Sequence, residues 1–276
     1  MSVIAIPAGV CGASSAPAGN QSLIDIITSL GLTSNLKICL DAGDADSYDP
    51  GVQTARWLDV SGNGYDFYRG SSTGGDAAEP TFNGSAGGLS SAEYFSFDGG
   101  DYFNYDSANE AWMDLLHNDG SLFTQFCMIY SPSSTILNLF TTALPATNYG
   151  AGIQVASNTL RLIMSTTSGS NTTNAVGSAI GLNAWQPLGV GVSENGGASG
   201  SSYIITGGST GTWNASNASA ATGTPTAAAT LGANPLKNNP FANGTRLACF
   251  AMWQGAALTT TNLSDIYIAI KGRFGL

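Results

Sequence analysis

The feature that most limits the possible folds is a series of short β-prone runs between residues 36 and 254. Each run holds β-branched or aromatic residues, and clusters of Gly, Asn and Ser separate it from the next. Many short strands with regular turn signals are typical of a sandwich or a barrel. The pattern predicts strands near residues 36–41, 56–60, 65–68, 92–97, 102–105, 122–131, 135–141, 151–155, 159–165, 174–179, 185–193, 202–207, 228–232 and 246–254.

Two of these runs, Phe126 to Tyr130 and Cys249 to Trp253, are almost continuously apolar. A strand buried on both faces has this pattern, so we expect both runs in the middle of a sheet or beneath a second layer. Residues 206–230 consist mainly of Gly, Ser, Thr, Ala and Asn, and we expect a long polar loop or a weak hairpin around Trp213.

We expect residues 1–35 to form an arm with one short helix, and residues 36–276 to form the sandwich domain. Four apolar residues at i, i+3, i+4 and i+7 share one helix face: Leu23, Ile26, Ile27 and Leu30. A lone helix of this length is marginal in water, so it docks either on its own sandwich or on a neighbouring subunit. We interpret the segment as an anchoring and assembly element.

A second helix is predicted at the C-terminal end of the chain. Its apolar face consists of Leu263, Ile266, Tyr267 and Ile270. The threonines at positions 259–261 offer an N-cap.

The charge of the chain is low and unevenly distributed. Charged residues make up 9% of the 276 residues, whereas hydrophobic residues make up 43% and are sufficient for a large core. The net charge is −10, most acids precede residue 120, and no basic patch is present, so nucleic acid is not an expected partner. No run approaches about 18 apolar residues, so membrane insertion is not expected. A neutral, polar surface suits extracellular or virion proteins.

The cysteines are more consistent with buried free thiols than with disulfides or metal ligands. Cys39, Cys127 and Cys249 lie in apolar, strand-like runs, and no pair among these and Cys11 has metal-ligand spacing. A chain that assembles in a reducing cytoplasm has this pattern.

The sequence lacks the residue pairs that catalysis requires, so we expect no enzymatic activity. A glycosidase needs two carboxyl groups on one face, but Glu93 and Asp98 are separated by an odd number of residues. Asp44 and Asp46 have the right spacing but lie in a turn-like stretch. The single histidine, His117, falls in a predicted short helix, and we expect it at the surface or as a helix cap rather than as a catalytic base.

Three motifs, in this order, resemble the concanavalin A-like lectin/glucanase superfamily in its laminin-G-type branch. They are the turn Trp57 to Gly64, the turn Phe97 to Gly99, and a closing strand, loop and helix from Trp253 to Ile270. The resemblance covers roughly residues 36–271. It implies an all-β, two-sheet antiparallel jelly-roll sandwich, here with a short helix at each end. Domains of this branch bind rather than catalyse, and similar ones occur in phage structural proteins.

The resemblance also implies calcium as a cofactor, because laminin-G-like domains often hold one Ca²⁺ at the sandwich rim. The matching positions are Asp59, Asn63, Asp98 and Asp101. The alternative is that Asp59 and Asn63 only hydrogen-bond their own turn.

Carbohydrate contact requires aromatic ring faces beside polar groups. The candidates are Tyr65, Tyr68, Tyr102, Tyr105 and Trp213. Each of these side chains has an alternative role in core or cross-strand packing.

We therefore expect a non-enzymatic virion structural protein of a bacteriophage: a capsid decoration, head-fibre or tail-associated protein that displays a lectin-like sandwich. It would assemble in the host cytoplasm and lie exposed on the particle surface. Its expected partners are other virion proteins, sister subunits and host cell-surface glycans. Two alternatives stay open, a stand-alone extracellular carbohydrate-binding module, with or without calcium, and a degenerate glycosidase.

Overall fold

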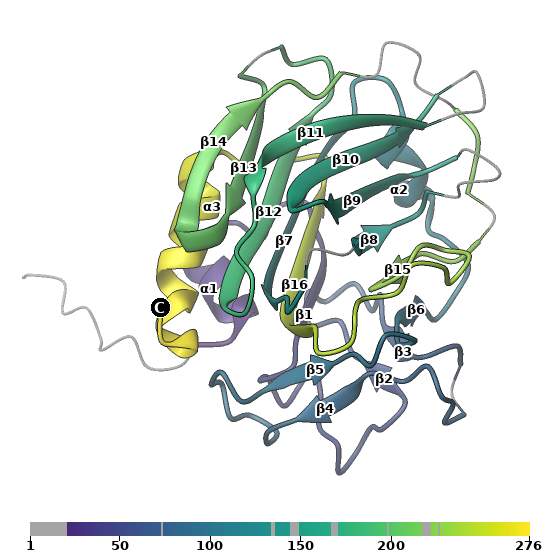
Figure 1. Ribbon diagram of the computed structural model, residues 1–276, viewed down its shortest axis with the longest axis vertical. Coiled ribbons are helices and arrows are strands. Elements are labelled where there is room, and N and C mark those ends of the chain that lie inside the picture. Colours follow the sequence, from purple (N-terminus) through teal and green to yellow (C-terminus); the bar gives the residue numbers. More distant parts are fainter. Residues whose placement is uncertain are drawn as a thin grey trace, which may run out of the picture.

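The sandwich predicted from the strand pattern is confirmed. The computed structural model describes residues 21–72, 74–133, 136–143, 149–166, 171–197, 199–216, 222–225 and 227–276. Within these ranges, sixteen strands form two antiparallel sheets that face each other (Figure 1). No helix in the same ranges is long and apolar enough to cross a membrane. Residues 1–20 of the predicted arm, including Cys11, lie outside the described residues.

The first sheet, sheet A, is built around the two most apolar strands. Its order is β14 (Ser209–Trp213), β13 (Ser201–Ile205), β12 (Trp185–Ser193), β7 (Leu122–Tyr130), β16 (Arg246–Gln254), β5 (Tyr94–Ser96) and β4 (Thr81–Asn83), and β1 (Leu36–Asp41) also pairs with β16. All residues of β7 and β16 except those at the two ends are buried. The expected central position of these two runs is therefore confirmed.

The second sheet, sheet B, has one face on the core and one face turned outward. Its order is β11 (Asn171–Ala179), β10 (Thr159–Ser165), β9 (Ala151–Ala156), β8 (Leu137–Thr141), β15 (Thr230–Leu231), β6 (Phe103–Tyr105), β3 (Phe67–Arg69) and β2 (Arg56–Trp57). In β9, Ile153 and Val155 are buried, whereas Gln154 between them is partly exposed. This alternation is typical of a sheet with a single buried face.

Aromatic side chains fill the space between the sheets. The ring of Trp57 lies 4.8 Å from that of Phe95 and 5.0 Å from that of Phe103, so it connects the two sheets. At the other end of the core, Phe140 of sheet B stacks on Phe250 of sheet A. Packed aromatic pairs of this kind stabilise a fold beyond the area that they bury.

Helices cover the outer face of sheet A. They are α1 (Leu23–Ser29), α3 (Thr260–Ile270) and the 3₁₀ helix η3 (Lys271–Phe274), which share one apolar cluster with β1, β7 and β16 (Figure 1). The capping box at Thr259 begins α3, as the threonines predicted. Leu263, Ile266, Tyr267 and Ile270 all face the cluster.

The interpretation of the first helix as an assembly element is corrected. Leu23, Ile26 and Ile27 are fully buried against the chain's own sheet A and α3, and Leu30 packs on the same cluster. The apolar face is therefore already covered and is not available to a neighbouring subunit. Ser22, whose hydroxyl accepts the N–H of Asp25, begins the helix.

Of the two alternatives for residues 206–230, a hairpin is found at residues 209–213, which form the edge strand β14 and pair with β13. One further expectation differs from the structure. His117, expected at the surface, is fully buried at the end of η1 (Leu115–His117), which follows α2 (Ala111–Asp114). Its Nε2 lies 2.7 Å from the Gly223 carbonyl oxygen, and burial lowers the pKa of the imidazole.

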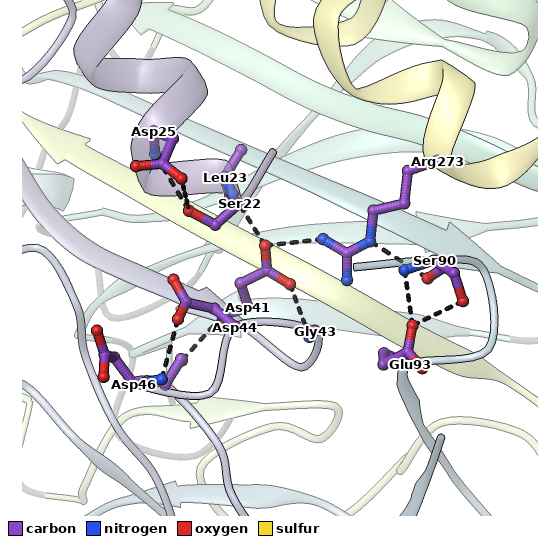
Figure 2. A network of polar contacts seen from close by, with 11 residues as sticks. Ser22, Leu23, Asp25, Asp41, Gly43, Asp44, Asp46, Ser90, Glu93 and Arg273 are labelled. Atoms are coloured by element: carbon purple, nitrogen blue, oxygen red, sulfur yellow. Dashed lines mark hydrogen bonds and ion pairs between the residues drawn. The ribbon is translucent and has the colours of Figure 1, made fainter. Parts of the chain in front are cut away.

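A buried ion pair joins the two ends of the described chain (Figure 2). Nη1 of Arg273 in η3 lies 2.8 Å from Oδ2 of Asp41 at the end of β1, and both side chains are nearly inaccessible to solvent. Asp41 also accepts the N–H of Leu23 at the start of α1 and that of Gly43. We call this group of residues the Asp41 clasp. It connects β1, α1 and η3 in one network.

Candidate functional site

The outward face of sheet B carries a row of polar side chains in cross-strand register. The pairs are Arg161 with Gln154, Gln154 with Asn138, Asn104 with Tyr68, and Tyr68 with Arg56. Thr230 of β15 pairs with Asn104 on one side and with Thr141, not Asn138, on the other, so the two halves of the row are offset along β8. We call these residues the polar row. Strands lie about 4.8 Å apart, so the seven strands from β10 to β2 span roughly 29 Å.

The first half of the polar row is ordered by side-chain amides. Nε2 of Gln154 donates to Oδ1 of Asn138 at 3.0 Å, and Nδ2 of Asn138 donates to the Asn239 carbonyl oxygen at 2.8 Å. Asn138 is buried by these contacts, whereas Gln154 and Arg161 remain partly exposed. The amide of Gln154 is thus held in one orientation at the surface.

A loop from residue 234 to residue 239 lies over the centre of the polar row. Oδ1 of Asn234 accepts two backbone N–H groups of this loop. Nζ of Lys237 donates to Oδ1 of Asn104 and lies 5.1 Å from the centre of the Tyr102 ring. Burial lowers the pKa of Lys237 to about 8. The loop therefore adds an amine to the face between its two halves.

At the far end of the row, Arg56 is paired with acids. Its Nη2 donates to the Tyr68 hydroxyl at 3.1 Å, and its guanidinium lies 5.0 Å from the centre of that ring. Its Nη1 lies 3.3 Å from Asp106 and 3.9 Å from Asp66. A hollow of about 460 Å³ adjoins this end and is lined by Val52, Gln53, Thr54, Ala55, Arg56 and Leu58.

Of the five aromatic residues predicted to contact carbohydrate, two lie at this face. Tyr68 is a member of the polar row and is partly exposed. Tyr102 lies under the amine of Lys237 and is 8% exposed. Tyr68 therefore offers part of its ring to a ligand, and Tyr102 mainly supports the loop.

The other three predicted aromatic residues lie elsewhere. Tyr65 is partly exposed and packs on the rings of Trp112 and Tyr105. Tyr105 is buried, its hydroxyl donates to Glu110 at 2.8 Å, and burial raises its pKa. Trp213 is 6% exposed, and its Nε1 donates to the backbone of β13. Tyr105 and Trp213 therefore have no open ring face for a sugar.

The first pair of predicted calcium ligands is bonded within its own turn. Oδ1 of Asp59 accepts the N–H groups of Cys39 and Ser61, and Oδ2 accepts the Ser61 hydroxyl and the Tyr65 N–H. The amide of Asn63 donates to two carbonyl oxygens of β1. The turn hydrogen bonds that we gave as the alternative are present for both residues.

The second pair lies in the turn between β5 and β6. Oδ2 of Asp101 accepts the N–H of Asp98, and Oδ1 of Asp98 accepts the N–H of Gly100. Asp101 is 3% exposed, and burial raises its pKa to about 7. Across the described ranges, no group of three or more acidic, histidine or cysteine side chains is arranged to hold a metal ion. Calcium binding stays a prediction.

The carboxylates considered for catalysis organise loops. Glu93 is 3% exposed, and its Oε2 accepts the N–H and the hydroxyl of Ser90 at 2.6 and 2.7 Å. Asp44 accepts the N–H of Asp46, and both residues line a hollow of about 310 Å³ together with Asp25 (Figure 2). Burial raises the pKa of Asp44. Figure 2 shows Glu93 on the opposite side of the Asp41 clasp from these acids.

The sequence interpretation missed most of the polar row. Arg161 and Gln154 each stand between two buried apolar residues, which was the available signal. That signal identifies the outward side of a single strand. It does not tell which strands are neighbours, and the row exists only because β10, β9 and β8 pair in this register.

Comparison by sequence finds no relative: no family model and no curated protein matches the chain. Similarity is found with solved structures. One is of botulinum neurotoxin type C, whose cell entry depends on interaction with two ganglioside molecules; it has a TM-score of 0.53 and 11% identity over 88% of this chain and 53% of that one. Another is the binding domain of botulinum neurotoxin DC in complex with rat synaptotagmin II, with a TM-score of 0.53 and 12% identity over 86% and 52%.

The receptor-binding domain of botulinum neurotoxin type G gives a TM-score of 0.51 and 12% identity, over 85% of this chain and 51% of that one. The chain thus spans about half the length of the structures that it matches. At this level of identity the likeness is one of fold. The laminin-G-type branch and the phage particle stay predictions. The chain is a β-sandwich of two antiparallel sheets, and the similarity to these binding domains is a similarity of fold.

Proposed function

We propose that this chain is a non-enzymatic, lectin-like binding protein and that the polar row on sheet B is its glycan-binding surface. The observation that carries the proposal is that two registers of polar side chains, Arg161 with Gln154 and Asn104 with Tyr68 and Arg56, lie on one outward face. The outer face of sheet A, by contrast, is covered by α1 and α3.

The chemistry of the row suits a sugar. Amide and guanidinium groups offer donors and acceptors at fixed angles, as hydroxyl-rich ligands require. A phenol ring such as that of Tyr68 provides an apolar face with a polar tip. The accessible members of the row lie on several strands, on either side of the loop that buries Asn138 and Thr230, so the face fits an extended saccharide better than a small, enclosed ligand. The neurotoxin domains of the same fold bind gangliosides or a protein receptor, which supports a binding role by analogy of fold.

Binding of full-length chain to a panel of soluble polysaccharides tests this proposal. Gln154→Ala should weaken binding several-fold, because the side chain loses its oriented amide. Gln254→Ala is the matched control, since Gln254 is a partly exposed glutamine at the end of β16 in the other sheet. Equal loss in both variants, or binding to no glycan, would reject the surface.

The absence of catalysis is part of the same proposal. The hydrogen bonds that hold Glu93 in its loop favour a structural role for this carboxylate. Incubation with a bound polysaccharide should release no sugar. Release that is lost in Glu93→Gln or Asp98→Asn would instead identify a glycosidase.

We further propose that the chain is displayed on a phage particle, with other virion proteins and sister subunits as partners and host glycans as targets. The resemblance of the Trp57 to Gly64 turn and of the closing strand, loop and helix to domains of phage structural proteins supports this proposal. Co-sedimentation with intact particles in a density gradient is the expected result. Recovery only as free protein would favour a stand-alone carbohydrate-binding module.

A further inference from the structure

The inference concerns Arg161, which lies at one end of the polar row. It projects from the outward side of β10, where Leu160 and Leu162 on either side are buried. Its register partner on β11 is Ala175, an exposed residue with a short side chain. Its partner on β9 is Gln154. Arg161 is thus next to an ordered amide on one side and a small, exposed residue on the other.

The charge of Arg161 is not neutralised. Among the described residues it takes part in no ion pair, whereas Arg56 at the other end of the row contacts Asp106 and Asp66. After residue 119 the sequence contains two acids, Glu194 and Asp265. Glu194 follows β12 and accepts the N–H of Gly120, and Asp265 lies in α3 on the other sheet. No acid is therefore present in β8, β9, β10 or β11.

The neighbours of Arg161 complete a small site. Gln154 donates one N–H to Asn138, and no described residue donates to its Oε1, which is left to accept a hydroxyl. Ile163 stands two residues along β10 on the same side and is partly exposed. A cation, an amide acceptor and an aliphatic surface within neighbouring strand positions match a carboxylate, a hydroxyl and the C–H face of one ring.

We propose that Arg161 is the anion-binding end of the polar row and that the ligand is a glycan carrying a carboxylate, an acidic sugar. This inference rests on the proposed function and specifies its ligand. A guanidinium pairs with a planar carboxylate through two parallel hydrogen bonds. The net charge of −10 does not oppose this, because the acids lie mainly before residue 120 and salt screens charges beyond about 8 Å at physiological ionic strength.

Matched ligand pairs test the inference by titration calorimetry on the full chain. The pairs are polygalacturonate with its methyl ester, and sialyllactose with lactose; dextran sulfate represents a sulfate source. The variants are Arg161→Gln, Arg161→Lys, and Lys271→Gln as a control with the same change of charge on η3, beside α3 and away from sheet B. Melting temperatures should stay equal, because Arg161 has no ion-pair partner among the described residues.

We expect the carboxylated member of at least one pair to bind more tightly than its neutral counterpart. Arg161→Gln should weaken that member about 10- to 100-fold, Arg161→Lys less, and Lys271→Gln not at all. A carboxylate preference that survives Arg161→Gln overturns the inference, and so does binding of dextran sulfate alone. Binding of neutral glycans without any preference overturns it while the proposed function stands. Binding to no glycan rejects both.

Discussion

Removal of the Arg273 side chain should destabilise the fold more than its position near the C-terminus suggests. In Arg273→Met, the carboxylate of Asp41 stays buried and keeps only the N–H groups of Leu23 and Gly43 as donors. The ion pair that it loses has an N–O distance of 2.8 Å, with side-chain exposures of 2% for Arg273 and 0% for Asp41. An uncompensated buried charge is among the costliest defects in a protein.

The expected loss of stability is about 3–5 kcal/mol, the range for breaking a buried pair on one side. A domain of this length unfolds with an entropy of roughly 0.6 kcal/mol per kelvin, so Tm should fall by about 5–9 °C. Lys271→Met is the control, because Lys271 is partly exposed and lies two residues earlier in η3. It should change the free energy of unfolding by less than about 0.5 kcal/mol.

Thermal unfolding followed by circular dichroism and calorimetry at pH 7 measures both variants. The double variant Asp41→Asn with Arg273→Met separates the causes, because Asn keeps an acceptor for the two N–H groups but buries no charge. It should be more stable than Arg273→Met alone. If Arg273→Met melts within about 1 °C of the parent, or if the double variant is the less stable of the two, the orphaned charge is not the cause.

Three further predictions concern other buried groups. Because the pKa of Asp101 in the folded chain, about 7, lies above the value of about 3.9 in an unfolded chain, the free energy of unfolding falls as pH rises from about 4 to about 7. Asp101→Asn should reduce the dependence of the free energy of unfolding on pH in melts recorded across that range. An unchanged dependence would contradict the raised pKa of Asp101. If calcium binds at Asp98 and Asp101, millimolar CaCl₂ should raise Tm and EDTA should reverse the rise. A Tm that neither reagent changes would contradict calcium binding at these residues. The thiols of Cys39, Cys127 and Cys249, whose pKa values burial raises, should resist iodoacetamide until the chain unfolds, and labelling of the native protein located by mass spectrometry would refute this.

The strand pattern predicted the architecture because strands buried on both faces consist of nearly continuous apolar residues. The continuous apolar runs of β7 and β16 indicated their central position, and the structure confirms it. The edge strands β4 and β14 showed no such apolar run, since β4 has a single apolar residue, Phe82, and Ser209 to Thr212 are polar or small. An edge strand needs only half of its backbone paired and little burial, so its composition resembles that of a loop.

The candidate site was less predictable than the fold. The sequence did not determine the surface on which α1 packs. An apolar helix face such as that of Leu23 and Ile27 fits its own sheet as well as another subunit. Gln154 and Arg161 showed their outward position through alternation. Their assembly with Asn104 required the order of strands in sheet B, in which β15 inserts between β8 and β6 from a segment far along the chain. Such long-range pairing is not encoded in local pattern.

The position of β16 has a consequence for how this chain is made. The strand lies between β7 on one side and β1 and β5 on the other, yet it leaves the ribosome after all the other strands of the two sheets. Until it emerges, β1 and β7 expose open edges, and the Asp41 carboxylate has no arginine. The nascent protein therefore cannot complete sheet A until residue 254 has emerged, and a premature stop codon shortly before residue 246 should yield a product that aggregates.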